Sequence, residues 1–127
     1  MKIFLLSLLL LSSCYKNKRV DRVTLYQMGK EVNSDIKLVL AESLGGGPSC
    51  EGENGEDPYG EGCMRVLEVE VGFMILRCVE FESEKTAKKE AKRIKEYYYK
   101  NWVFDEVRGE PPLEMFVRKA FGAKLIE

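Results

Sequence analysis

The stretch RVLEVEVGFMILRCVEF, residues 65–81, has apolar side chains at every second position. This period of two is typical of a β-strand with one buried face. The run is longer than an ordinary strand, and Gly72 interrupts it. We therefore expect a bulge, a sharp bend or a turn between two strands at Gly72. On a continuous strand, the buried face carries Leu67, Val69, Val71, Phe73, Ile75, Val79 and Phe81.

Two shorter segments precede this stretch. In residues 35–41, Ile36, Leu38 and Leu40 alternate with other side chains, which predicts a strand. Residues 20–29 leave two alternatives open, because the run Val23–Tyr26 favours a strand while Asp21 and Gly29 could cap a short helix.

Two helices are predicted after the strands, over 84–101 and 112–121. Ser83 is a good N-cap for the first, which has apolar positions at helical spacing: Ala87, Ala91, Ile94 and Tyr98. Pro112 suits the first turn of the second, and Gly122 suits its end. Its apolar stripe comprises Leu113, Phe116, Val117, Ala120 and Phe121. The stretch 97–121 also resembles uncharacterised bacterial envelope proteins, and this resemblance implies no activity.

These elements predict an α+β fold for a single domain over 21–127. We expect a small antiparallel sheet from 35–41 and 65–81, which 22–28 could join as a further strand. The two C-terminal helices are expected to pack on one face of this sheet.

An acidic, Gly-rich loop is predicted at 43–62. Among the cysteines, a Cys50–Cys63 disulfide is favoured, because both residues flank a stretch with little else to order it. Cys78 lies in an apolar run and is expected to be a buried free thiol. The loop could hold Ca²⁺ through an irregular set of oxygens, but a solvated acidic loop is the favoured interpretation. The candidate ligands are Glu51, Glu53, Glu56 and Asp57.

The N-terminus begins with Met-Lys and a short apolar run, which is the layout of a secretory signal. Its end, Leu11-Ser12-Ser13-Cys14, resembles the lipobox of bacterial lipoproteins. The resemblance implies a signal peptide over 1–13, cleavage before Cys14, a diacylglycerol on the Cys14 sulfur and an acyl chain on the new amino group. Residues 14–20 would form a lipidated tether. Tyr15 stands where an Asp would favour inner-membrane retention, so the resemblance implies the outer membrane, facing the periplasm.

Composition restricts the chemistry. The chain has no histidine, which excludes Ser–His and Cys–His nucleophiles and His-based zinc sites within it. The formal net charge of −1 gives no reason to expect a nucleic acid as partner. No cofactor is implied.

The hypothesis favoured by these observations is a non-enzymatic, lipid-anchored envelope protein that binds another protein or is structural. Its candidate binding patch comprises Lys92, Arg93, Tyr97, Tyr99 and Trp102, because exposed aromatic side chains beside basic ones are common in interfaces. One alternative is a periplasmic or cell-wall enzyme that uses Cys78 or a carboxylate pair such as Glu68 and Glu70. The other is a Ca²⁺-stabilised binding module.

Overall fold

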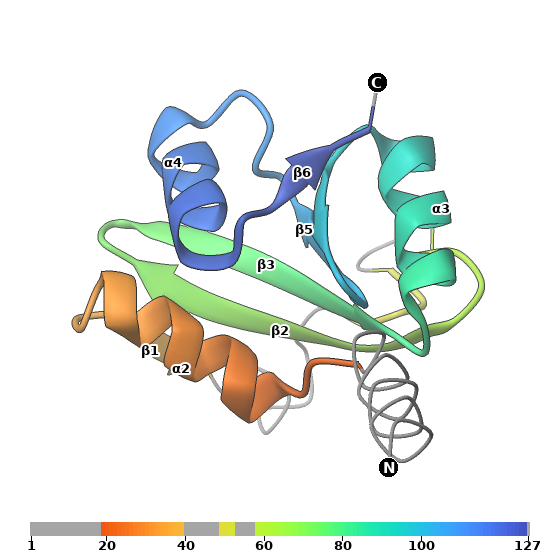
Figure 1. Cartoon of the computed structure of the whole chain (residues 1–127). Helices are drawn as coiled ribbons and strands as arrows, with labels where there is room; N and C mark the ends of the chain where they lie inside the picture. Colours follow the sequence, from red (N-terminus) through yellow and green to blue (C-terminus); the bar gives the residue numbers. More distant parts are fainter. Residues whose placement is uncertain (1–18, 40–48, 53–57, 127) are drawn as a thin grey trace, which may run out of the picture.

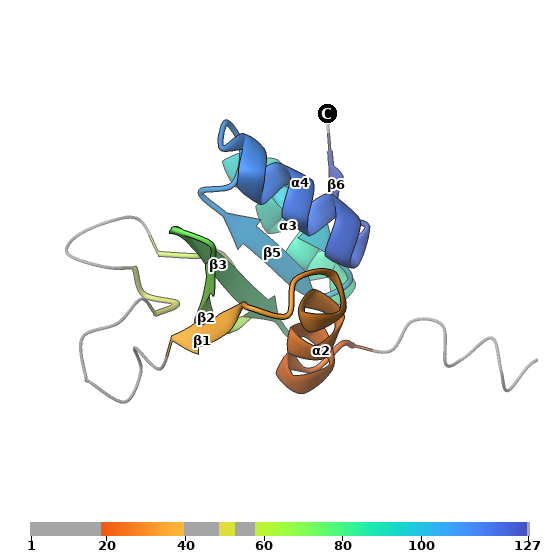
Figure 2. The ribbon, with the colours of Figure 1, turned by 90° about the vertical axis from the view of Figure 1, so that its left-hand side faces the viewer.

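The computed structural model describes residues 19–39, 49–52 and 58–126. Within them the chain forms one six-stranded antiparallel sheet and three helices, which confirms the α+β fold (Figures 1 and 2). The helices are α2 (Arg22–Val32), α3 (Glu84–Ile94) and α4 (Pro111–Phe121). The strands are β1 (Lys37–Val39), β2 (Cys63–Val71), β3 (Met74–Phe81), β4 (Tyr97–Tyr99), β5 (Trp102–Asp105) and β6 (Lys124–Leu125). They lie in the order β1-β2-β3-β5-β4-β6. None of the helices in the described ranges is long and apolar enough to cross a bilayer.

The long apolar run folds as the hairpin β2–β3, so the turn is confirmed among the three alternatives. Gly72 has a φ of 64° and opens a two-residue turn, a position where a side chain would be strained. Val71 therefore pairs with Met74, and Leu67 pairs with Cys78. The turn shifts the alternation by one residue. The predicted common face is consequently wrong for Ile75, Val79 and Phe81, which point away from Leu67.

Both faces of the sheet are covered. Residues Cys78 and Phe104 lie in a core cluster with side chains of α2 and α4, while their neighbours Val79 and Val103 lie in a second cluster with α3. Figure 1 shows α4 and α3 on either side of β5 and β6, and Figure 2 shows α2 next to α4. The expectation that both C-terminal helices pack on one face is therefore wrong. The central strands are apolar on both sides, so each side needs a covering layer.

Helix α3 ends earlier than predicted. Ser83 caps it as expected, but Lys95 adopts the left-handed conformation with φ 60°, and the helix ends at Ile94. Residues 97–99 form β4, which pairs with β5, so the prediction of helix through 101 is wrong. Three consecutive tyrosines favour a pleated strand, and burial between neighbouring elements outweighs the helical spacing of Tyr98.

Residues 22–32 are helical, so of the two alternatives for this segment the helix is confirmed and the additional strand is wrong. The Asp21 side chain accepts a hydrogen bond from the Thr24 N–H, which is the N-cap interaction. β1 confirms part of the predicted strand 35–41, whose last two residues lie outside the described residues. α4 follows the prediction to within one residue and ends at Phe121, with Gly122 as its C-cap at φ 67°.

Candidate functional site: the N-terminal clamp and the α2 pocket

The main chain at the start of the described fold is held by two buried side chains. The Val20 N–H donates to the Asn101 side-chain oxygen at 2.7 Å, and the Trp102 indole N–H donates to the Val20 carbonyl at 2.7 Å. Asn101 also donates to the carbonyl of Phe81 at 3.2 Å. Both polar groups of Val20 are thus bound to the turn between β4 and β5 and to the start of β5.

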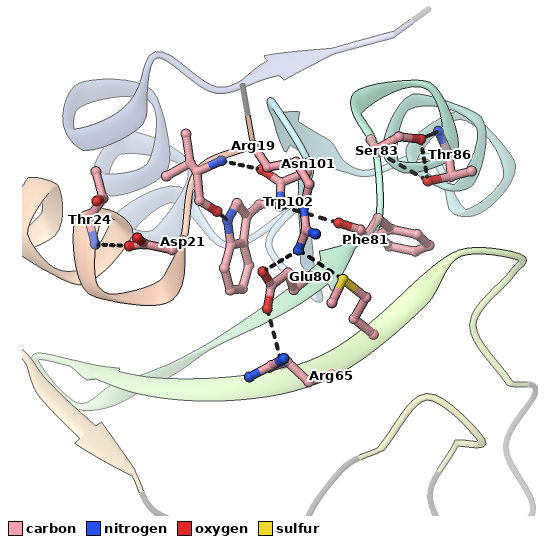
Figure 3. A network of polar contacts seen from close by, with 12 residues as sticks. Arg19, Asp21, Thr24, Arg65, Glu80, Phe81, Ser83, Thr86, Asn101 and Trp102 are labelled. Carbon is pink, nitrogen blue, oxygen red and sulfur yellow. Dashed lines mark hydrogen bonds and ion pairs between the residues drawn. The ribbon is translucent and has the colours of Figure 1, made fainter. Parts of the chain in front are cut away.

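An ion-pair cluster extends this attachment (Figure 3). Glu80 on β3 is buried, and its two carboxylate oxygens lie 2.9 Å from Arg19 and 3.0 Å from Arg65. Two guanidinium groups therefore compensate one buried carboxylate, which would be costly without them. We refer to Arg19, Val20, Glu80, Asn101 and Trp102 as the N-terminal clamp. It fixes the fold from Arg19 onward, five residues after Cys14.

An apolar cavity of about 150 Å³ lies between α2 and the sheet. Leu25 of α2 covers it on one side, and Phe116 and Phe121 of α4 line it as well. The sheet side is formed by Leu67, Val69, Leu76 and Cys78. We call this cavity the α2 pocket. Its size matches that of cavities that hold about one benzene-sized group.

The α2 pocket opens to solvent beside the first turn of α2. Val23 is 59 % exposed and Leu38 is 41 % exposed, although both also line the pocket. Arg22 is exposed beside them and, within the ranges that the structure describes, is the one charged residue that lines the pocket. The Tyr26 hydroxyl, also in the lining, donates to the Ile36 carbonyl at 3.1 Å. The described part of the rim is therefore apolar with a single positive charge.

Cys78 is a buried free thiol, as predicted, and forms part of the pocket wall. Burial raises the pKa of this thiol far above its ordinary value, and the nearby charge of Glu68 raises it further. The reactive thiolate is therefore scarce at neutral pH, which is unsuitable for a nucleophile. The other proposed catalytic groups share one face of β2, where Glu68 lies 3.5 Å from Arg77 and Glu70 is exposed.

The Cys50–Cys63 disulfide is confirmed. It closes the loop beside α3, where the Gly60 N–H donates to the buried Glu90 carboxylate at 2.7 Å. Of the candidate Ca²⁺ ligands, Glu51 is exposed, and Glu53, Glu56 and Asp57 lie outside the described residues. Within the ranges that the structure describes, no three acidic or cysteine side chains gather as a metal site. The Ca²⁺ hypothesis stays a prediction.

The predicted binding patch does not form a common surface. Lys92 and Arg93 are exposed on α3, but Tyr97 and Trp102 are buried in the cluster on the opposite face of the sheet. Tyr99 is half-buried there. Because α3 ends at Ile94 and residues 97–99 form β4, the members of the predicted patch lie on different elements.

Comparison of the chain with protein families, with curated proteins and with solved structures finds no match. Functional inference therefore depends on the residues themselves. Sequence reasoning missed that Asn101 binds the Val20 N–H and that Arg22 lies beside an apolar pocket. For Asn101 the sequence offered one signal of a turn, because asparagine between two aromatic runs is a residue type common in tight turns. Arg22 had none, since the pocket is assembled from five separate elements.

Proposed function

We propose that this protein is a lipid-anchored protein of the bacterial envelope, whose domain is a non-enzymatic binding module held at the membrane surface. The lipobox-like sequence ending at Cys14 supports the anchor. The N-terminal clamp supports a position of the domain close to the membrane, because it leaves only a short linker between the lipid and the fold.

The linker sets the distance from the bilayer. From Cys14 to Arg19 a fully extended chain spans at most about 17 Å. The clamp opposes any lengthening of the linker. If Val20 were released, the buried Asn101 and Trp102 side chains would each lose a hydrogen bond. Lys16 and Lys18 would each add attraction of about 1 kcal/mol to anionic headgroups. The domain would therefore stay within headgroup distance.

Binding is favoured over catalysis by the groups available. The chain has no histidine, and the Cys78 thiol is buried with a raised pKa. The α2 pocket offers an apolar surface instead. Tyr15, directly after Cys14, favours the outer membrane over the inner one in this proposal.

Mass spectrometry of the protein isolated from membranes tests the proposal. We expect an N-terminal peptide that begins at Cys14 and carries a diacylglyceryl group and an N-acyl chain, in the outer-membrane fraction. Cys14→Ser should abolish the modification and the membrane association, whereas Ser13→Ala, which keeps a small residue before the cysteine, should preserve both. An unmodified wild-type protein, or one that starts elsewhere, contradicts the proposal.

A further inference from the structure

We propose that the α2 pocket is a binding site for a single-chain fatty acid, with the hydrocarbon end inside the pocket and the carboxylate at Arg22. The described residues that line this pocket do not include any member of the clamp. The inference rests on the cavity, its charge and its place near the lipid attachment, and only the last of these depends on the proposed function.

The lining sets the chemistry of the inserted group. The walls are aliphatic and aromatic, and Leu76 and Cys78 at the back are each 1 % exposed. The Tyr26 hydroxyl already donates to a main-chain carbonyl. A polar group placed inside would lose its hydrogen bonds to water without replacement, which costs several kcal/mol in an apolar medium. A hydrocarbon group gains instead about 0.8 kcal/mol for each buried methylene.

The volume sets the size. A cavity of about 150 Å³ is as large as one that holds benzene, so it would take roughly six carbons. This suits the end of one straight chain and is too small for a fused polycyclic ring system or for two chains. The rest of the chain would cross the exposed rim formed by Val23 and Leu38, which would be covered in the complex.

The charge at the opening sets the headgroup. Of the described residues that line the pocket, Arg22 is the charged one. A guanidinium pairs well with a carboxylate through two parallel hydrogen bonds. A compact group with one negative charge matches one guanidinium, which favours a fatty acid over a lysophospholipid with its additional polar glycerol.

The pocket opening lies close in the sequence to the proposed lipid attachment site, which would place it near a source of acyl chains. Arg22 lies eight residues after Cys14 and two after the clamped Val20. Fully extended, the eight residues span at most about 28 Å, so the opening would stay close to the membrane in which acyl chains are released and exchanged.

The test uses the chain over 14–127 with Cys14→Ser, which contains every described residue and needs no detergent. Calorimetric titration with dodecanoate below its micellar concentration should show one site. Leu38→Trp should close the opening and weaken binding at least about tenfold, because several methylenes lose their burial. Met115→Trp is the matched control, since Met115 is 69 % exposed on α4 and outside the pocket. It should leave the affinity unchanged.

A second comparison tests the headgroup. Arg22→Gln should weaken dodecanoate binding about two- to fivefold, as expected for an exposed ion pair, and leave dodecanol binding unchanged. The proposal is overturned if dodecanoate does not bind, if the Leu38→Trp and Met115→Trp variants bind alike, or if a dodecanoyl lysophospholipid binds and dodecanoate does not. An unmodified Cys14 in cells would contradict the proposed lipid anchor. The titrations would still show whether the α2 pocket binds a fatty acid.

Discussion

The two faces of the sheet are packed in different ways. On one face, α3 contacts the strands through Ala87 and Ala91, which are 0 % and 1 % exposed. These small side chains let the helix lie close to the sheet. On the other face, α2 buries only Leu25 and Gly29 and leaves the α2 pocket beneath it. A chain of this size can therefore combine a face on which small residues bring one helix close to the sheet with a face that keeps a cavity beneath one of its helices.

The close-packed face is also the one that is covalently fastened. The disulfide at Cys63 ties the preceding loop to β2, and the Gly60 N–H of that loop donates to Glu90 of α3. The looser face has no such fastening among the described residues. The contrast between the two faces predicts how each should respond to substitution.

The largest effect is expected from loss of the disulfide. Replacing both Cys50 and Cys63 by Ser opens a loop with a sequence separation of 13. For a loop of this length the free energy of unfolding should fall by about 3 kcal/mol in the chain-entropy model. Urea unfolding followed by the fluorescence of Trp102, the single tryptophan, measures it. Dodecanoate affinity should be unchanged. Equal midpoints for the oxidised and reduced wild-type protein would contradict this expectation.

A smaller loss is expected when the α3 contact is overfilled. Ala91→Leu adds three carbons where the helix already touches the sheet, and overpacking of this kind costs about 1–3 kcal/mol. The same urea titration measures the change. If Ala91→Leu were neutral, the two faces would not differ in packing.

Val69→Ile is the matched substitution on the other face. It adds one methyl group toward the α2 pocket, and cavity filling commonly raises stability by about 0.5–2 kcal/mol. The same variant should weaken dodecanoate binding, because the added methyl group takes space from the ligand. A loss of stability here would show that the cavity cannot accept a further carbon.

The sequence predicted elements better than their arrangement. Ser83, Pro112 and Gly122 identify helix ends through local chemistry, and they mark real boundaries in the fold. The end of α3 escaped prediction because Lys95 adopts a left-handed conformation that usually favours glycine. The covering of both faces escaped it because the turn at Gly72 reverses the alternation, and periodicity alone leaves the bulge, bend and turn equally open.

The candidate sites follow the same division. The Cys50–Cys63 pairing could be inferred from the chain between the two cysteines. The clamp joins Val20 to residues 101 and 102, and the pocket joins α2 to three strands and α4. Contacts between residues this far apart in the sequence depend on the strand order, which the sequence left unspecified.

The smallest effect concerns acid stability and two buried carboxylates, Glu90 within α3 and Glu96 just after it. Burial alone would raise the pKa of Glu90, but hydrogen bonds from Arg93 and the Gly60 N–H outweigh it and hold the pKa below 4.5. The Glu90 carboxylate therefore stabilises the fold above its unfolded pKa, and this contribution is lost as the pH falls through the folded pKa. Between about pH 7 and about pH 3.5, the wild-type protein should lose more stability than Glu90→Gln.

Glu96, just after α3, has a pKa shift of the opposite sign to that of Glu90. Burial raises its pKa, although the main-chain N–H groups of Arg108 and Val107 partly oppose the shift. Its contribution is present below the unfolded pKa and is lost as the pH rises through the folded one. Glu96→Gln should therefore remove a term that favours the fold at low pH, and the wild-type protein should lose less stability on acidification than this variant. Urea midpoints of the three proteins at both pH values measure the two differences, and equal signs would contradict the assignment of opposite roles to these carboxylates.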